Sequence, residues 1–323
     1  MRAFVTGGTG FLGTHLINAL RTRGDEVVCL VRSPAKAASR AWQDVRMVRG
    51  DLNDAAALRQ GCEGADVVFH IAGRIAARDE SDFMASNRDG TANVLAAAAT
   101  HPPRRFVFVS SLAVAGPTVP GHPVDETRQP APVTPYGRSK LAGERLVQAG
   151  SIPWTIIRPP VVYGEWDEAL VDLFRLARLV VVPMFGDGSQ EISLIHGADL
   201  AAAFVAVATS ERAAGRVYFA SHPAPTTTRE LALAVGRAVG KQPRLVPLPQ
   251  SIARAVLWTV GSVARLAGRA AVLSLERAPE FFAPAWTCRA DALRADTGWE
   301  ARVDLAPGLS RAASWYREAG WLN

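Results

Sequence analysis

The stretch AFVTGGTGFLG, residues 3–13, sets the architecture of the whole chain. Its first half is a short apolar run with the composition of a buried strand. Its second half is a glycine-rich loop that leads into the helical spacing of Leu12, Leu16, Ile17 and Leu20. A buried strand that turns through glycines directly into a helix predicts a chain in which strands and helices alternate.

The same alternation continues to about residue 160. Apolar strand-like runs recur at EVVCLVR (26–32), VRMVRGDL (45–52), ADVVFHIAG (65–73), RRFVFVSS (104–111) and WTIIRPP (154–160). Helical segments are expected between them, at 11–23, 55–61, 83–100 and 135–150. Continuous apolar strands separated by helices predict a parallel sheet that is covered on both faces.

Beyond Pro160 the pattern is less regular. We expect helices at 168–179 and 199–209, a turn-rich segment at 181–190 and a strand at 216–221. From residue 226 the chain is interpreted as proline-rich helices and loops. This predicts a core over residues 1–160 and a small, mostly helical lobe over 161–323, interleaved with the last elements of the core.

Composition narrows the function classes. The chain has 323 residues, 49% hydrophobic and 20% charged, which predicts a packed globular core. The net charge is +6 without a dense basic run, so no nucleic-acid partner is expected. The three cysteines, Cys29, Cys62 and Cys288, lack metal-ligand spacing. We therefore expect no metal site, and with no secretory signal visible we expect a cytoplasmic protein.

The glycine loop predicts a dinucleotide site. Gly7, Gly10 and Gly13 are spaced three apart, and Gly8 with Gly10 and Gly13 also satisfies the fingerprint. Such glycines allow a tight turn, close approach of a pyrophosphate and close packing of helix on strand. The helix that begins at Phe11 and Leu12 then offers free N–H groups to phosphate. The expected fold is therefore a Rossmann-type doubly wound parallel sheet with a substrate lobe.

The end of the second strand favours NADP. Val31 occupies the place where an acid would bind the ribose of NAD, and Arg32 follows it. An arginine pairs well with a 2′-phosphate, and Ser33 and Lys36 are expected to assist it. NAD is the less favoured cofactor. Asp51 and Leu52, after the third strand, are expected either to contact the adenine or to form a turn.

The segment TPYGRSKLAGERL (134–146) places Tyr136 and Lys140 on one helix face. A phenol has a reference pKa of about 10, and a nearby ammonium favours its ionised form. Tyrosine could then exchange a proton with a carbonyl or alcohol oxygen while the cofactor transfers hydride. Ser110 and Ser111 end the fifth strand, where ligands bind in such sheets.

Taken together, these motifs resemble the extended short-chain dehydrogenase/reductases of the NAD-dependent epimerase/dehydratase superfamily. The matching segments are TGGTGFLG, GDLND, VFHIAG, NRDGTANVLAAA, FVFVSSLAVAG, YGRSK, IIRPPVVYG and LIHGADLA, in family order. The resemblance implies that Tyr136 is the catalytic acid/base and Lys140 its pKa-lowering, ribose-holding partner. Ser111, five residues before Gly116, matches the catalytic serine, and Ser110 is expected to be structural.

The resemblance also assigns roles around the cofactor. It implies that Ala72 and Gly73 allow close approach of the cofactor, and that Pro159, Pro160 and Val162 pack near the nicotinamide carboxamide. Structural roles are expected for four polar residues: His70, Asn87, His196 and Asp199.

Within this family, the sequence favours a ketone reductase similar to the 3β-hydroxysteroid dehydrogenase and dihydroflavonol reductase branch. Ile192 stands where sugar-nucleotide enzymes usually have an arginine, and RPPVVYG lacks their asparagine. Leu112 and Ala113 replace the acidic residues typical of dehydratases. A sugar-nucleotide epimerase or dehydratase is the alternative. A non-catalytic NADP-binding regulator is a further alternative that the serine, tyrosine and lysine argue against.

The C-terminal lobe is apolar, which suits a small hydrophobic ketone or alcohol as substrate. The segments IARAVLWTVGSVARLAG, AAVLSLE and PEFFAPAW are interpreted either as pocket lining or as the core of the lobe. Candidate lining residues are Leu257, Trp258, Phe281, Phe282 and Trp286. The helix at 251–268 could also rest weakly on a membrane surface. Related enzymes often pair through the YGRSK helix, so a homodimer is expected.

Overall fold

The computed structural model describes residues 1–179, 181–267 and 275–322. Its main element is a parallel sheet of seven strands in the order β11-β6-β5-β4-β1-β2-β3. The strands are β1 (Arg2–Thr6), β2 (Glu26–Val31), β3 (Val45–Arg49), β4 (Val67–His70), β5 (Arg105–Val109), β6 (Trp154–Arg158) and β11 (Arg216–Phe219). The predicted doubly wound parallel sheet is confirmed.

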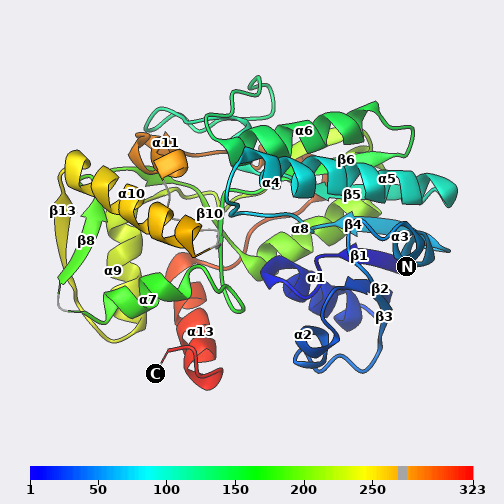
Figure 1. Cartoon of the computed structure of the whole chain (residues 1–323), viewed down its shortest axis with the longest axis horizontal. Helices are drawn as coiled ribbons and strands as arrows, with labels where there is room; N and C mark the ends of the chain where they lie inside the picture. The colour runs from blue at the N-terminus through cyan, green and yellow to red at the C-terminus, as the bar shows by residue number, and fades with distance from the viewer. Residues whose placement is uncertain (180, 268–274, 323) are drawn as a thin grey trace.

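Helices cover both faces of this sheet (Figure 1). On one face lie α1 (Phe11–Thr22) and α8 (Gly197–Thr209). On the other face lie α3 (Ala55–Cys62), α5 (Gly90–Thr100) and α6 (Pro135–Ala149). Short helices α2 (Pro34–Ala38) and η2 (Leu112–Val114) follow β2 and β5, and η3 (Glu211–Ala213) and α12 (Asp291–Thr297) pack near β11.

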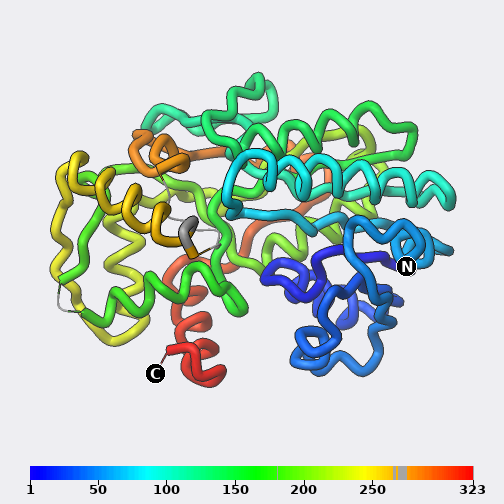
Figure 2. Tube along the Cα trace, in the orientation of Figure 1, coloured from blue at the N-terminus to red at the C-terminus, as the bar shows by residue number. Residues whose placement is uncertain are grey.

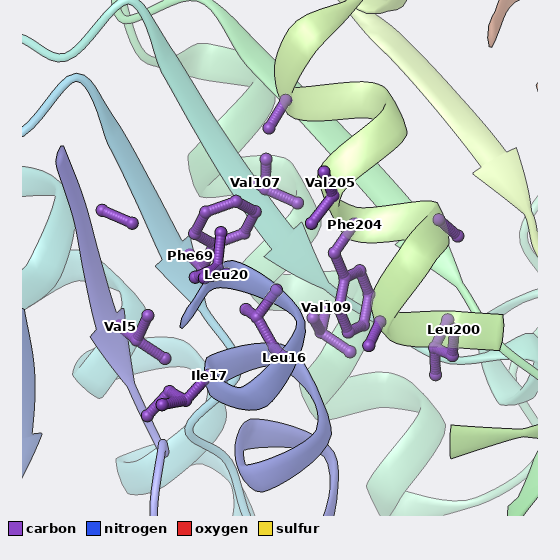
Figure 3. Packing of buried hydrophobic residues seen from close by; sticks show 14 of the residues in the cluster. Val5, Leu16, Ile17, Leu20, Phe69, Val107, Val109, Leu200, Phe204 and Val205 are labelled. Atoms are coloured by element: carbon purple, nitrogen blue, oxygen red, sulfur yellow. The ribbon is translucent and has the colours of Figure 1, made fainter. Parts of the chain in front are cut away.

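Two hydrophobic clusters hold the sheet and its helices together. In β1, Val5 points to the α1 and α8 side while Phe4 points to the α3 and α5 side. Figure 3 shows the first cluster, in which Leu16 of α1 and Phe204 of α8 meet over the strands. Because side chains alternate along a strand, burial on both faces requires the unbroken apolar runs found in the sequence.

The second half of the chain builds a lobe with its own core. Its helices are α7 (Val171–Ala177), α9 (Thr228–Ala238), α10 (Gln250–Leu266), η4 (Leu275–Arg277), α11 (Ala278–Phe282) and α13 (Leu305–Glu318). Its strand pairs and small sheet use β7 (Val161–Tyr163), β8 (Val181–Phe185), β9 (Glu191–Ile192), β10 (Leu194–His196), β12 (Thr226–Thr227), β13 (Arg244–Leu248) and β14 (Ala285–Trp286). Figure 2 shows the trace returning from this lobe to the sheet. The predicted boundary between core and lobe at residue 160 stays a prediction.

Three sequence expectations differ from the structure. The helix expected over 83–100 is divided into α4 (Glu80–Met84), a π-helical turn η1 (Ala85–Asp89) and α5. It begins earlier because the Asp79 side chain caps α4 by accepting from the Asp82 amide. The helix expected over 168–179 is shortened to α7. The turn-rich segment 181–190 contains β8, whose parallel pairing with β13 no local pattern indicates.

The helix expected over 251–268 is present as α10, although residue 268 and most of the AAVLSLE segment lie outside the described residues. None of the described helices has the length and apolar content needed to span a membrane. Within the same part of the chain, no group of side chains is arranged to hold a metal ion. The cysteines are free and buried.

Candidate active site

The glycine loop between β1 and α1 is packed too closely for side chains. Gly7 has φ of +77°, and a Cβ there would lie 2.6 Å from the Ala72 amide nitrogen. A Cβ on Gly13 would lie 2.2 Å from the Gly7 carbonyl oxygen. Gly10 is extended, precedes α1 and donates its N–H to the Gly7 carbonyl at 3.0 Å. Glycine is therefore required at both positions by the lack of space, at Gly7 against the segment that follows β4 and at Gly13 within the loop itself.

The first turn of α1 provides an anion site. No acidic side chain lies in that turn, and no side chain caps it. Within the described residues, no hydrogen bond is made by the amides of Phe11, Leu12 and Gly13. These residues line a cavity of about 970 Å³ that also reaches the ends of β2, β4 and β5. Free amides and a positive helix end suit a pyrophosphate, so the residues fit a nicotinamide dinucleotide.

The far end of this cavity carries the predicted adenosine contacts. Arg32 and Lys36 line it, and Lys36 Nζ lies 3.2 Å from Glu168 Oε1. Ser33 caps α2 by accepting from the Lys36 amide at 3.3 Å and is not among the cavity-lining residues. Asp51 lines the cavity and also accepts from the Asn53 amide at 2.7 Å. Asp51 therefore forms a turn and also lies on the cavity, so the two roles considered for it are compatible.

Leu52, Ala72, Gly73, Pro159 and Val162 also line this cavity, and their contact with the cofactor stays a prediction. The backbone of Pro159 is held by a hydrogen bond from the Leu112 amide to its carbonyl, at 2.9 Å.

Sequence reasoning missed Arg40, which closes one side of the glycine loop. Its Nη2 donates to the Thr9 carbonyl at 2.8 Å, and its guanidinium lies 4.1 Å from the centre of the Trp166 ring. Trp166 has a left-handed φ of 72°, which is unusual for a bulky side chain. Arg40 and Trp166 are 126 positions apart, and neither lies in a recognisable motif.

The predicted Ser111, Tyr136 and Lys140 line the same cavity. Tyr136 and Lys140 lie in the first turns of α6, where Thr134 caps the helix by accepting from the Gly137 amide at 3.2 Å. Lys140 is 4% exposed, and its Nζ donates to the Val109 carbonyl at 2.9 Å. A Cβ on Gly73 would lie 3.0 Å from that Nζ, so glycine leaves the space that the lysine uses.

Burial dominates the protonation of this group. Burial raises the pKa of Tyr136, and a hydrogen bond with Ser111 and the charge of Arg277 only partly oppose it. Burial lowers the pKa of Lys140 to about 8, against the opposing charge of Glu144. The Lys140 ammonium group donates to the Val109 carbonyl in this structure. Because burial raises its pKa, Tyr136 is held as a neutral phenol.

Two buried polar contacts support α6 from behind. Glu144 accepts two hydrogen bonds from Arg158, at 2.8 and 2.6 Å, and both side chains are nearly inaccessible. Asn87, in the π-helical turn η1, donates to Ser139 of α6 at 2.9 Å and accepts from the Arg74 amide at 2.8 Å. These contacts agree with the structural role expected of Asn87. No pattern in the sequence indicates the Glu144–Arg158 pair.

The other polar residues singled out in the sequence make structural contacts. His70 is enclosed between the hydroxyls of Thr6, at 2.7 Å, and Thr91, at 3.0 Å, and burial lowers its pKa to about 3. His196 Nδ1 accepts from the Ala198 amide at the start of α8. Asp199 accepts from the amides of Arg302 and Val303 and so ties the C-terminal tail to α8.

Ser110 behaves differently from the other polar residues. Ser110 lines the cavity, and its buried hydroxyl has no hydrogen-bond partner among the described residues.

The substrate side of the cavity is formed by the lobe. Ile192, Leu231, Phe281 and Trp286 line it. The expectation for Trp258 was wrong, because its side chain is 61% exposed on α10. Leu257 is buried outside the cavity lining, and Phe282 packs towards Phe185, with ring centres 6.4 Å apart. Neither residue is part of the cavity wall.

Comparison with known proteins agrees with this geometry. The family model of the NAD dependent epimerase/dehydratase family matches residues 3–220. A ceramide reductase of Caulobacter vibrioides is 34% identical, covering 98% of this chain and 95% of the relative. A 2-alkyl-3-oxoalkanoate reductase of Stenotrophomonas maltophilia is 32% identical, covering 96% and 98%. The 4-hydroxy-2-methyl-3-oxo-4-farnesyl-3,4-dihydroquinoline-1-oxide ketoreductase of Stigmatella aurantiaca is 33% identical, covering 96% and 95%.

Solved structures show the same fold. The UDP-glucose 4-epimerase of Thermus thermophilus in complex with NAD superposes with a TM-score of 0.81, at 24% identity, over 99% of this chain and all of the other. The fold, the family match and the reductase relatives lead to one conclusion. The chain belongs to the NAD-dependent epimerase/dehydratase family and is an NAD(P)-dependent oxidoreductase of the short-chain dehydrogenase/reductase superfamily, acting on CH–OH and C=O groups.

Proposed function

We propose that this protein is an NADP-dependent reductase of ketones on bulky hydrophobic substrates, and oxidises the corresponding secondary alcohols in reverse. One observation carries the proposal. A single cavity joins the free amides of α1, the Ser111, Tyr136 and Lys140 side chains and an apolar wall. A site that binds a dinucleotide at one end and an apolar molecule at the other suits hydride transfer to a ketone.

Each residue of the site has a separate role in the proposed reduction. The cofactor, when bound, supplies the hydride that adds to the carbonyl carbon. The Tyr136 hydroxyl donates its proton to the carbonyl oxygen, and Ser111 donates a hydrogen bond to the same oxygen. Since burial raises the pKa of Tyr136, the phenol carries its proton at neutral pH, as this direction requires. Lys140 holds positive charge close by and is expected to bind the cofactor ribose.

The preference for NADP rests on the end of β2. Arg32 and Lys36 line the cavity there, and Val31 leaves no carboxylate at the position that favours NAD. Lys36 also pairs with Glu168 at 3.2 Å, so Arg32 is the cation best suited to bind a 2′-phosphate.

The apolar wall supports a hydrophobic substrate. Ile192 presents a buried aliphatic side chain to the cavity where an arginine would serve a sugar diphosphate. Three relatives that match nearly the whole chain are reductases whose names include a ceramide, an alkyl oxoalkanoate and a farnesyl quinoline. Each of these names describes a substrate with an apolar part, which favours the same class here.

The test is NADPH consumption with a panel of hydrophobic ketones, using wild type and Tyr136→Phe. We expect turnover with wild type, and a loss of about 10²- to 10⁴-fold in the variant with cofactor binding retained. An active Tyr136→Phe enzyme would refute the mechanism. Conversion of a UDP- or GDP-sugar without net cofactor change would instead support the epimerase alternative. Cofactor binding without any turnover would indicate a regulator.

Two associations also follow as proposals. Helix α10 exposes Ile252, Val256, Val260 and Val263 along one stripe, and this stripe suits weak contact with a lipid surface. Co-sedimentation with anionic vesicles tests it, and protein that stays in the supernatant would contradict it. A homodimer through α5 and α6 is expected, and light scattering after gel filtration measures the mass.

A further inference from the structure

Arg277 stands out on the substrate side of the cavity because it is a charged residue beside the Tyr136 ring. Its guanidinium carbon lies 5.9 Å from the centre of that ring, and the side chain is 19% exposed. Both residues line the cavity. Neither the proposed proton transfer nor the cofactor groove uses this arginine.

One edge of the Arg277 guanidinium group is held by Glu280. Its Nε and Nη2 donate to Glu280 Oε2 at 2.7 and 2.5 Å. The other carboxylate oxygen of Glu280 accepts from Thr134, the residue that caps α6, at 2.9 Å. The Glu280 carbonyl accepts from Gln190 and from Trp286, each at 2.9 Å. The short helix α11 is thus tied to the start of α6, and the two lie next to each other in Figures 1 and 2.

The other edge of the guanidinium remains available. Among the described residues, Nη1 of Arg277 has no hydrogen-bond partner. Glu280 is fully occupied by Arg277 and Thr134, so it fixes the arginine and leaves its outer N–H groups to the cavity. A planar guanidinium with one edge anchored and one edge free suits a planar oxygen acceptor such as a carboxylate.

We propose that Arg277 is a specificity-determining residue that binds a carboxylate on the substrate, one carbon away from the carbonyl that is reduced. This rests on the proposed function and narrows its substrate class to 3-oxo acids with an apolar tail. The guanidinium carbon of Arg277 lies 5.9 Å from the centre of the Tyr136 ring, so a carboxylate bound by Arg277 would lie near the carbonyl that Tyr136 protonates. A 3-oxo acid, in which one carbon separates the carboxylate from the carbonyl, suits this arrangement. The apolar wall formed by Ile192 and Trp286 then takes the tail.

The test uses the stable alcohols in the oxidation direction. NADP⁺ reduction is followed with a 3-hydroxy fatty acid, its methyl ester and a secondary alcohol of equal chain length. The wild type should favour the acid, and Arg277→Gln should lower kcat/KM for the acid about 10- to 100-fold, the worth of a charged hydrogen bond. The same variant should change the ester by less than about 3-fold. Arg277→Lys, which keeps the charge, should retain part of the preference.

Arg254→Gln is the matched control. This arginine lies in the same lobe, exposed on α10, 5.7 Å from the Phe282 ring and outside the cavity lining. It should leave the acid preference unchanged. Equal use of acid and ester by wild type, or equal losses for both in Arg277→Gln, would overturn the assignment of Arg277.

A binding measurement separates this inference from the proposed function. If none of these alcohols is oxidised and no ketone of the panel is reduced, the proposed function fails. The melting temperature of the NADP complex is then measured with the acid and with the ester. Stabilisation by the acid in wild type and Arg254→Gln, but not in Arg277→Gln, would support the carboxylate site independently. Absence of any acid-specific stabilisation would refute it.

Discussion

Glu144→Gln should destabilise the protein strongly, because it breaks a buried ion pair that fastens α6 to β6. Glu144 and Arg158 are 1% and 5% exposed and share two hydrogen bonds, at 2.8 and 2.6 Å. Removing one charge leaves the other buried without compensation, which costs about 3–5 kcal/mol. Glutamine still offers one acceptor, so we expect the lower end, about 3 kcal/mol. For a chain of this length, that corresponds to about 4 °C in melting temperature.

The same helix offers a matched control. Arg138 of α6 also makes two hydrogen bonds to a glutamate, Glu80, at 2.8 and 2.7 Å, but both side chains are 43% exposed. Glu80→Gln should therefore cost less than about 1 kcal/mol. Urea unfolding followed by circular dichroism measures both variants. Equal shifts in the urea midpoints of the two variants would refute the reasoning. The contribution of an ion pair to stability would then depend on its hydrogen-bond geometry and not on its burial.

Replacing both partners distinguishes a lost attraction from an uncompensated charge. The double variant with Glu144→Leu and Arg158→Met contains no buried charge at this place. It should recover most of the stability lost in Glu144→Gln, since apolar side chains can replace a buried pair at little cost. A double variant that is less stable than Glu144→Gln would show that the pair itself is strongly net favourable.

Three further changes test the cofactor groove and the protonation of the site. Burial lowers the pKa of Lys140 to about 8 from 10.5, so between these values the unfolded chain binds the extra proton and stability rises with pH. Lys140→Met should flatten that rise in urea midpoints measured from pH 7.5 to 10; an unchanged slope would contradict it. Arg32→Gln should weaken NADPH binding about 10- to 100-fold and NADH binding little, as measured by cofactor fluorescence; equal losses would argue against a 2′-phosphate contact. Gly13→Ala would place a Cβ 2.2 Å from a backbone oxygen and should destabilise the protein by about 1–3 kcal/mol. Gly10→Ala should cost less, because its Cβ would lie 3.3 Å from the same oxygen. Melting curves in which Gly10→Ala is the less stable variant would contradict this.

The cofactor end of the site follows closely from local sequence. The spacing of Gly7, Gly10 and Gly13 and the strand before them already predict a turn that only glycine fits, and the structure gives the close contacts at Gly7 and Gly13 that explain why. Ser111 and Tyr136 are expected near each other because parallel strands end at the same edge of the sheet. The structure places both on one cavity, and their catalytic roles stay predictions.

The substrate end could not be predicted in the same way. Trp258 belongs to an apolar segment yet lies exposed, whereas Trp286 in a similar segment lines the cavity. Composition alone cannot separate the two, because the side of a helix or strand that is buried depends on what packs against it. Burial, which the sequence does not reveal, is the largest influence on the pKa of Tyr136 and raises it, so the pKa-lowering role of Lys140 stays a prediction.

The fold class and the glycine loop of the dinucleotide groove could therefore be predicted from the sequence alone. Both depend on hydrophobic periodicity and on short motifs whose residues are adjacent in the chain. Three contacts could be identified only from the tertiary structure: Arg277 with the Tyr136 ring, Arg40 with the Trp166 ring, and Glu144 with Arg158. The first two join residues more than a hundred positions apart, and the third joins a helix to the next strand. No local pattern marks such pairs, since their energy comes from burial and from partners that only packing brings within reach.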